Sequence, residues 1–462
     1  MKKKFCKPIR RIISGVTCAS LIAALTTASY ADETATTMAA SNKYAYSIGV
    51  DHGFVWPWSS DLSGDFTPNV NYACTAYGMI SNVSSYKNYT PDVSYMKGNN
   101  PNGIRRIASD IVFLNGHGNY DNVCFNSGNQ GGDYATGVYM GNDFDSSTGY
   151  SYVGIDSTDM STCDHISFVA CCTAKNTNNI TKKAYTKGAK SSLGFTDEIT
   201  SRSNDGSGWI CKFNDALANG YSISRCVTYA TEFYPDSDLA SYAKIYGSSS
   251  NTVTSSSASY ASSNILNEVN ALKSVSTSID VPEIENVVNA DIPNNDFINK
   301  IVDGILGIDS TFDSSDYKMT INMFAPQDGT GMIKFQYFVN DEISTNKAYI
   351  AYIENNKVVD VTCSQAATEM QYLAMNAKAT EEESIEAIEE LIITAVSQHK
   401  ENSISTQNID EITSDSIVKV DDGYKYDYTN NELRYEHTVF YIVPNTNNAI
   451  GEYTTTTVLP LS

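Results

Sequence analysis

The sequence is poor in basic residues. It has 31 Lys and Arg against 53 Asp and Glu among 462 residues, which gives a formal net charge of −22. So acidic a chain repels phosphates, and we expect neither nucleic acid nor an anionic membrane to be its main partner. Charged residues make up only 18% of the chain and hydrophobic residues 41%. This composition indicates a globular protein rather than a disordered acidic tail.

Histidine is also scarce, with five residues, and the ten cysteines include no Cys-x-x-Cys pair. The missing pair argues against a zinc ribbon or a thioredoxin-like site. Eight cysteines follow the N-terminal leader described next. Outside the cell an even number permits disulfides, but a catalytic cysteine would leave at least one other thiol unpaired.

The N-terminus predicts a secretory signal peptide over residues 1–31. Six Lys and Arg precede the apolar run 12–24, and the small residues Ser29 and Ala31 offer a cleavage site. The alternative is a membrane anchor, but the apolar run is shorter than the roughly 20 residues that a span needs. No other segment is apolar enough to span a bilayer. We therefore expect a protein secreted by a bacterium.

A Ser-rich stretch, residues 247–263, reads as a linker between two halves. The first half, residues 40–246, alternates short apolar runs with helical patterns. Strands are expected at 46–50, 111–114, 166–170 and 192–195, and helices at 179–187, 209–218 and 222–233. Such alternation predicts an α/β fold with a mostly parallel sheet flanked by helices.

The second half, residues 264–462, predicts an accessory α+β module with an antiparallel sheet. Strands are expected at 319–324, 332–339, 348–353, 357–361, 416–428 and 433–443, and helices at 296–306, 366–375 and 384–397. Thr380 and Glu383 form a capping box for the last helix. No residue pattern here points to a chemical site.

Two strands of the first half each lead into a residue suited to nucleophilic catalysis. One strand precedes His117-Gly118, and the other precedes Cys171-Cys172. In an open parallel sheet, the carboxyl ends of neighbouring strands meet at the crevice where ligands bind. A histidine can move a proton there and a thiolate can attack. The backbone N–H groups of Gly118 and Cys171 would then hold the oxyanion of an acyl-transfer intermediate.

These motifs resemble the caspase–hemoglobinase group of cysteine peptidases, which includes clostripain, gingipain, legumain, separase and the caspases. The group has one hydrophobic block that ends in His-Gly and a second that ends in Ala-Cys. In this chain the matching pairs are His117-Gly118 and Ala170-Cys171. The spacing of 54 positions between His117 and Cys171 is close to the roughly 50 of caspases. The resemblance covers residues 46–235. It implies a caspase-like core with a His/Cys dyad.

Cys172 is the local competitor of Cys171 for the role of nucleophile. It lies one place beyond the position of the group's nucleophile, and on a strand the next side chain faces the other way. We therefore favour Cys171. A strained disulfide between the two neighbours, as a reversible inactive form, is a further alternative.

The other four histidines fit a dyad less well. His52 also precedes a glycine after a candidate strand, and we expect it at the same edge of the sheet. His165 precedes its strand and should lie at the opposite edge. His399 and His437 follow the cysteine, which is the order in papain-like enzymes. A papain-like cysteine opens a helix, however, whereas Cys171 closes a strand.

The resemblance transfers no side-chain specificity. In the group, the residue two places before the nucleophile often lines the pocket for the side chain before the scissile bond. Clostripain and legumain have acids there and caspases have Gln, but this chain has Val169. Asp197, after the next strand, is a candidate partner for a Lys or Arg side chain, or a helix cap. No Arg lies near either motif in the sequence, which argues against the Arg-dependent acidic specificity of caspases.

No cofactor is expected, with calcium as the open alternative because extracellular relatives such as clostripain need it. Two short carboxylate clusters on predicted loops are the candidates, at residues 142–145 and 236–238. Calcium takes about six to eight oxygen ligands. Neither cluster supplies these alone, so loop capping is the favoured reading and no metal ligand is assigned.

Together these patterns predict a secreted cysteine endopeptidase that acts on protein or peptide substrates. Processing near the Ser-rich stretch is expected, because relatives are often made as zymogens. One alternative is an inactive scaffold that serves as a secreted binding protein. Another is a transpeptidase or amidase with the same dyad. No pattern indicates the oligomeric state.

Overall fold

The computed structural model describes residues 43–50, 66–89, 91–126, 135–145, 150–254, 274–280, 295–339, 343–364, 417–427, 432–442 and 447–459. The predicted signal peptide, the helices at 366–375 and 384–397 with their capping box, His52 and His399 lie outside these residues. No helix in the described ranges is long and apolar enough to cross a membrane.

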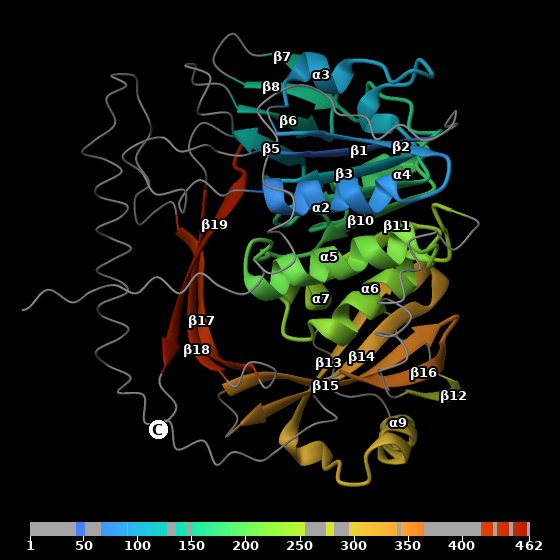
Figure 1. The fold of residues 1–462 in the computed structure, drawn as a ribbon, viewed down its shortest axis with the longest axis vertical. Coiled ribbons are helices and arrows are strands. Elements are labelled where there is room, and N and C mark those ends of the chain that lie inside the picture. The colour runs from blue at the N-terminus through green and yellow to red at the C-terminus, as the bar shows by residue number, and fades with distance from the viewer. Residues whose placement is uncertain are drawn as a thin grey trace, which may run out of the picture. The chain divides into compact units, whose positions relative to one another are not determined.

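A six-stranded sheet organises the first half of the chain (Figure 1). Five neighbouring strands run parallel, and the last strand, β11, pairs antiparallel with β10. In sheet order they are β11 (Ala243–Gly247), β10 (Ser191–Phe195), β9 (His165–Val169), β3 (Ile111–Asn115), β1 (Lys43–Gly49) and β2 (Val83–Asn88). The four strands expected from the sequence are all present. β3 and β9 are buried along their full length, as central strands covered on both faces should be.

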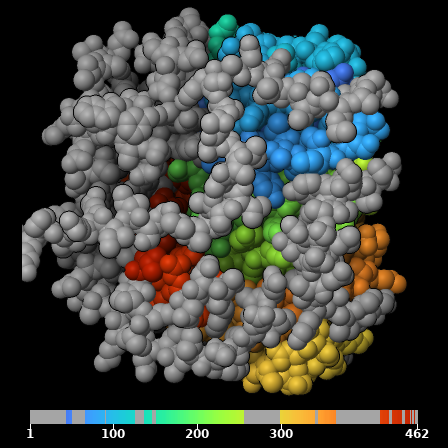
Figure 2. Space-filling view, viewed as in Figure 1, coloured from blue at the N-terminus to red at the C-terminus, as the bar shows by residue number. Residues whose placement is uncertain are grey.

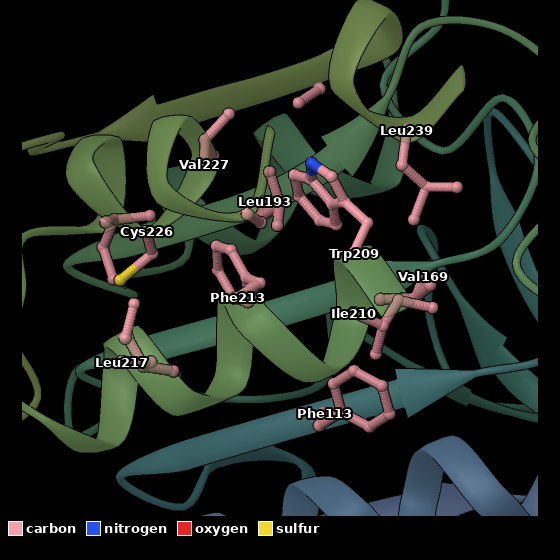
Figure 3. Packing of buried hydrophobic residues seen from close by; sticks show 14 of the residues in the cluster. Phe113, Val169, Leu193, Trp209, Ile210, Phe213, Leu217, Cys226, Val227 and Leu239 are labelled. Atoms are coloured by element: carbon pink, nitrogen blue, oxygen red, sulfur yellow. The ribbon is translucent and has the colours of Figure 1, made fainter. Parts of the chain in front are cut away.

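Helices cover both faces of this sheet. They are α2 (Thr67–Gly78), α3 (Val93–Lys97), α4 (Ile180–Thr186), α5 (Asn204–Ala218), α6 (Ile223–Phe233) and α7 (Asp238–Tyr242). Side chains alternate along each strand: Phe113 packs in the core with α2, α5 and α6, whereas Leu114 packs in the core with α3 and α4. Figure 3 shows the first of these cores, where Trp209, Phe213 and Leu193 meet. The predicted α/β class is therefore confirmed.

A second sheet contains 13 strands from both halves. The first half supplies β4 (His117–Asn119), β5 (Asn122–Asn126), β6 (Ala135–Tyr139), β7 (Phe144–Asp145) and β8 (Tyr150–Gly154), and the second half supplies β12 (Ser274–Asp280), β13 (Tyr317–Ala325), β14 (Thr330–Val339), β15 (Ile343–Glu354), β16 (Lys357–Cys363), β17 (Ile417–Asp427), β18 (Glu432–Ile442) and β19 (Ile450–Leu459). The two sets join where Ile450 of β19 pairs with Gly118 of β4.

The second half follows its predicted pattern in β13–β16, which are antiparallel, and in α9 (Asn295–Ile308), whose apolar side chains pack on them. Asn355 and Asn356 turn between β15 and β16 with positive φ, the backbone of a two-residue hairpin. This half is not a separate compact unit, because residues 35–462 cluster as one. Figure 2 shows part of β17–β19, coloured red, at the surface of the face drawn.

The Ser-rich stretch does not begin as the flexible linker expected at residue 247. Ser249 and Val253 are buried. Asn251 donates hydrogen bonds to the Asp164 carbonyl and to the Ser191 hydroxyl, at 2.7 and 3.1 Å. Small polar side chains suit a flexible linker, but they can also form hydrogen bonds with buried backbone groups. Up to residue 254 this stretch packs in the second way.

Trp209→Ala should strongly destabilise the fold. The indole is buried, stacks on Phe213 with 5.5 Å between ring centroids, and donates a hydrogen bond to Thr231. Removing it leaves a cavity and takes one hydrogen-bond donor from the Thr231 hydroxyl, and we expect the free energy of unfolding to fall by about 3–5 kcal/mol. Urea unfolding followed by far-ultraviolet circular dichroism measures this. Tyr185→Ala, at an exposed aromatic, is the control and should change it by less than about 0.5 kcal/mol.

Candidate active site

The two sequence motifs lie at adjoining strand ends. β3 and β9 pair in parallel with Asn115 opposite Val169, and His117 and Cys171 each follow two residues later. A Cβ atom placed on Gly118 would come within 2.8 Å of the Ala170 Cβ and 3.5 Å of the Cys171 carbonyl oxygen. Glycine at 118 therefore permits the close approach of the motifs. The structure thus places the two motifs that the sequence singled out at one edge of the sheet.

His117 begins β4, separated from the end of β3 by Gly116, and is buried. Its ring packs edge-on against Phe66, with 5.1 Å between the ring centroids. Its neighbour Gly118 pairs with Val123 of β5 on one side and with Ile450 of β19 on the other. The candidate oxyanion donor thus lies between two strands.

Cys171 is buried, and its thiol donates a hydrogen bond to the Ile199 carbonyl at 3.6 Å. Burial raises the pKa of the Cys171 thiol well above its usual value, and the negative charge of Glu452 raises it further. Within the described residues, the thiol is directed at the loop after β10. It is uncharged at neutral pH in this arrangement.

Cys172 lies in a turn and not on a strand, which corrects one step of the sequence argument. β9 ends at Val169, and Cys172 has φ 61°, so strand alternation does not separate the two cysteines. The Cys172 thiol donates to Glu198 at 3.3 Å, and the ammonium of Lys175 lies 3.8 Å from its sulfur. Both neighbouring cysteines are free thiols, so they form no vicinal disulfide here. The preference for Cys171 now depends on its position next to Gly118.

The two predicted specificity residues have other contacts. Val169 is buried in the core on the α5 side, near Ile210 (Figure 3). The Asp197 carboxylate accepts a hydrogen bond from Lys175 at 2.9 Å. Cys172, Asp197 and Glu198 have ligand atoms close enough to share a metal ion, but the ammonium of Lys175 already lies among them. Asp197 is therefore already paired with a cation of the chain itself.

The candidate calcium clusters are likewise bound by groups of the chain. Asp143 lies 3.2 Å from Arg105 and 3.3 Å from Lys97. Asp236 accepts from Gln336, and Asp238 accepts from the backbone N–H and hydroxyl of Thr200. The bond from the Thr200 backbone N–H is of the capping kind favoured from the sequence, whereas the contacts of Asp143 and Asp236 join side chains.

The described histidines other than His117 lie away from the motifs. His165 is buried at the opposite end of β9, with its ring nitrogens 3.0 Å from the Ser191 hydroxyl and 2.8 Å from that of Ser167. Burial lowers the pKa of His165 to about 3, so it is a neutral core residue. His437 lies within β18, paired with Thr455 of β19.

A buried amide network fixes the loop after β10 beside the motifs. The Asn115 amide donates to the Val169 carbonyl at 2.8 Å and to the Ser201 hydroxyl at 3.4 Å. Asn69 of α2 donates to Asn115 and to the Ser201 carbonyl, at 2.9 and 3.0 Å. Ser201 and its neighbour Arg202 are thereby held next to the ends of β3 and β9.

Arg202 binds an acidic residue that the sequence reasoning missed. Its backbone N–H donates to the Glu452 carboxylate at 2.9 Å, and its guanidinium donates to the Glu452 carbonyl at 2.6 Å. No Arg lies near either motif in the sequence, but the loop after β10 folds back to the strand ends and brings Arg202 beside them. Residues 250 positions apart pair here, and no local pattern in the sequence signals such a contact.

Glu452 is an unusual buried carboxylate. Burial raises its pKa to about 7, although the charge of Arg202 opposes the shift. Its Oε1 contacts Arg202 and the Ser201 hydroxyl, whereas Oε2 is buried and has no hydrogen-bond partner among the described residues. A half-satisfied buried carboxylate costs stability when it ionises.

Comparison of the sequence with protein-family models and with curated proteins finds no match. The site must therefore be interpreted from its own geometry and from the motifs. That geometry comprises a histidine and a thiol at neighbouring strand ends, a close-fitting glycine, and an arginine–glutamate pair beside them.

Glu452→Gln should flatten the pH dependence of stability. The raised pKa means that the folded protein binds the Glu452 proton more tightly than the unfolded chain does. Stability should therefore fall as pH rises from about 4.5 to about 7, by up to about 3 kcal/mol. Burial also raises the pKa of Asp238, to about 6. Its ionisation lowers the stability of both proteins in the same direction.

The measurement is the free energy of urea unfolding at pH 4.5, 6, 7 and 8 for both proteins. The wild type should lose stability over this range by more than the variant does. Parallel pH curves would show that Glu452 is not buried as described.

Proposed function

We propose that this chain is a secreted cysteine endopeptidase with a caspase-like core, in which His117 and Cys171 form the catalytic dyad. One observation carries the proposal: both motifs lie at the carboxyl ends of adjacent parallel strands, and Gly118 fits against Ala170 and Cys171. The order of strands and helices around the motifs also agrees with the resemblance found in the sequence. The substrates are proteins or peptides.

The reaction transfers an acyl group to sulfur and then to water. The Cys171 sulfur attacks the carbonyl carbon of the scissile peptide bond, and its proton passes to His117. His117 gives that proton to the leaving amine nitrogen as the C–N bond breaks, which leaves a thioester on Cys171. Water then attacks the thioester, transferring a proton through His117 to the sulfur. The carboxylic acid leaves and the thiol is restored. Gly118 and Cys171 donate backbone N–H groups to the oxyanion.

The described arrangement corresponds to a resting state of such an enzyme. The thiol is protonated and is directed at Ile199, and β19 pairs with the strand that carries His117. Displacement of β19 would admit solvent and remove the charge of Glu452, and both changes lower the pKa of the thiol. The same covered thiol also suits the second candidate, an inactive scaffold that binds a partner.

Substitutions at the dyad separate the two candidates. With casein as substrate under reducing conditions and with calcium supplied, Cys171→Ala should abolish cleavage, a loss of at least about 10³-fold. His117→Ala should slow cleavage by about 10²- to 10⁴-fold, because the leaving amine loses its proton donor. Cys172→Ala is the matched control and should retain activity within about tenfold.

Initial rates and thermal melting of each variant are measured together. Cleavage that survives in Cys171→Ala but is lost in Cys172→Ala would transfer the nucleophile to Cys172. The inactive scaffold would be favoured by a different result. In that case wild type and Glu452→Ala would both be folded, and neither would cleave protein or react with a thiol electrophile.

A further inference from the structure

The bend that leads into β19 and the first residue of β19 itself are held against the candidate site. Asn119 donates its side-chain amide to the carbonyls of Asn447 and Asn448, at 2.8 and 2.9 Å. Ile450 then pairs with Gly118, whose other side is occupied by β5. An added antiparallel strand is a common way for a protein to bind an extended peptide. β19 therefore occupies the edge that a substrate backbone would use.

The side chain two residues farther along this strand enters a site built for a carboxylate. Glu452 Oε1 accepts from the Arg202 N–H at 2.9 Å, lies 3.4 Å from Arg202 Nε, and is 3.4 Å from the Ser201 hydroxyl. The Arg202 guanidinium also binds the Glu452 carbonyl, so it contacts backbone and side chain of the same residue. Recognition by charge and by main-chain geometry together is typical of an arginine subsite.

This site adjoins the nucleophile. Ser201 is held by Asn115, the last residue of β3, and the Cys171 thiol donates to Ile199 in the same loop. Oε2 of Glu452 has no hydrogen-bond partner within the described part of the chain although it is buried. A purely structural ion pair normally satisfies both oxygens. The incomplete pairing fits an occupant that can be exchanged.

We propose that Ser201 and Arg202 form a subsite for the carboxylate of an acidic residue in a peptide substrate, and that Glu452 of β19 fills it as a competitor from the same chain. This inference rests on the proposed peptidase function. The ligand class is an extended peptide with a Glu or Asp side chain at the position that reaches Arg202. A Lys or Arg side chain has no equivalent partner there, because Asp197 is paired with Lys175.

The test uses three acyloxymethyl ketone tripeptides that differ only in the last residue, Glu, Gln or Lys. The thiolate forms a thioether at the ketone's methylene carbon and expels the carboxylate leaving group, which adds a fixed mass. Intact mass gives the labelling rate, and peptide mapping locates the label. The proteins are full-length wild type, Glu452→Ala, Glu452→Gln, and Glu452→Ala combined with Arg202→Gln, each checked by thermal melting.

Glu452→Ala should label at Cys171 with the Glu probe at least about tenfold faster than wild type does. In that variant the Glu probe should react at least about tenfold faster than the isosteric Gln probe, the discrimination that a charge-assisted hydrogen bond provides. Adding Arg202→Gln should remove this preference, so that the Glu and Gln probes then react at rates within about threefold of each other. Glu452→Gln, which keeps the side-chain shape, should lie between wild type and Glu452→Ala.

Glu436→Ala is the matched control. Glu436 is a buried acid on the neighbouring strand β18 and pairs with Lys425 at 2.9 Å, so its removal should not speed labelling. Equal rates with the Glu and Gln probes, or a fastest rate with the Lys probe, would overturn the subsite while leaving the dyad intact. No label on Cys171 from any probe in any folded variant would instead overturn the peptidase function itself.

Discussion

The parallel register between β3 and β9 is the constraint on which the candidate site depends. Asn115 opposite Val169 places the next residues of both strands at one edge, with His117 and Cys171 two positions beyond. A shift of one residue would reverse the face of every side chain on one strand and separate the motifs. The Asn115 amide reinforces this register because it bonds to the neighbouring strand and to the loop that carries Ser201.

The second constraint is the return of the chain's C-terminal part to this edge. β19 pairs with β4 and so joins the strands of the second half to the strand that carries His117. The pair of β19 and β4 therefore belongs both to the 13-stranded sheet and to the candidate site. Its glutamate is buried against Arg202 at a cost in desolvation. An interaction that is costly and incompletely paired suits a contact that must open. In the proposed enzyme, the contact of Glu452 with Arg202 therefore keeps β19 in place, and the Cys171 thiol becomes accessible only when that contact opens.

Much of the first half could be predicted because its signals are local. β3 and β9 are short and apolar on both faces, and Asn179 and Gly188 bound α4 as an N-cap and a positive-φ stop. The edge strand β2 and the Thr-rich β19 lack an apolar pattern, so neither was predicted. The pairing of Arg202 with Glu452 depends on tertiary contacts across 250 residues, and the turn at Cys172 invalidated an argument that assumed a longer strand.

The central claim is that a peptide with an acidic residue replaces β19 at the thiol. A crystal structure of the full-length protein, labelled with the peptide ketone that ends in Glu, tests it most directly. We predict a thioether at Cys171, the probe backbone paired with Gly118, and the probe carboxylate bound to Arg202, with Glu452 withdrawn. A probe attached elsewhere, or attached to Cys171 with Glu452 still bound to Arg202, would contradict this account.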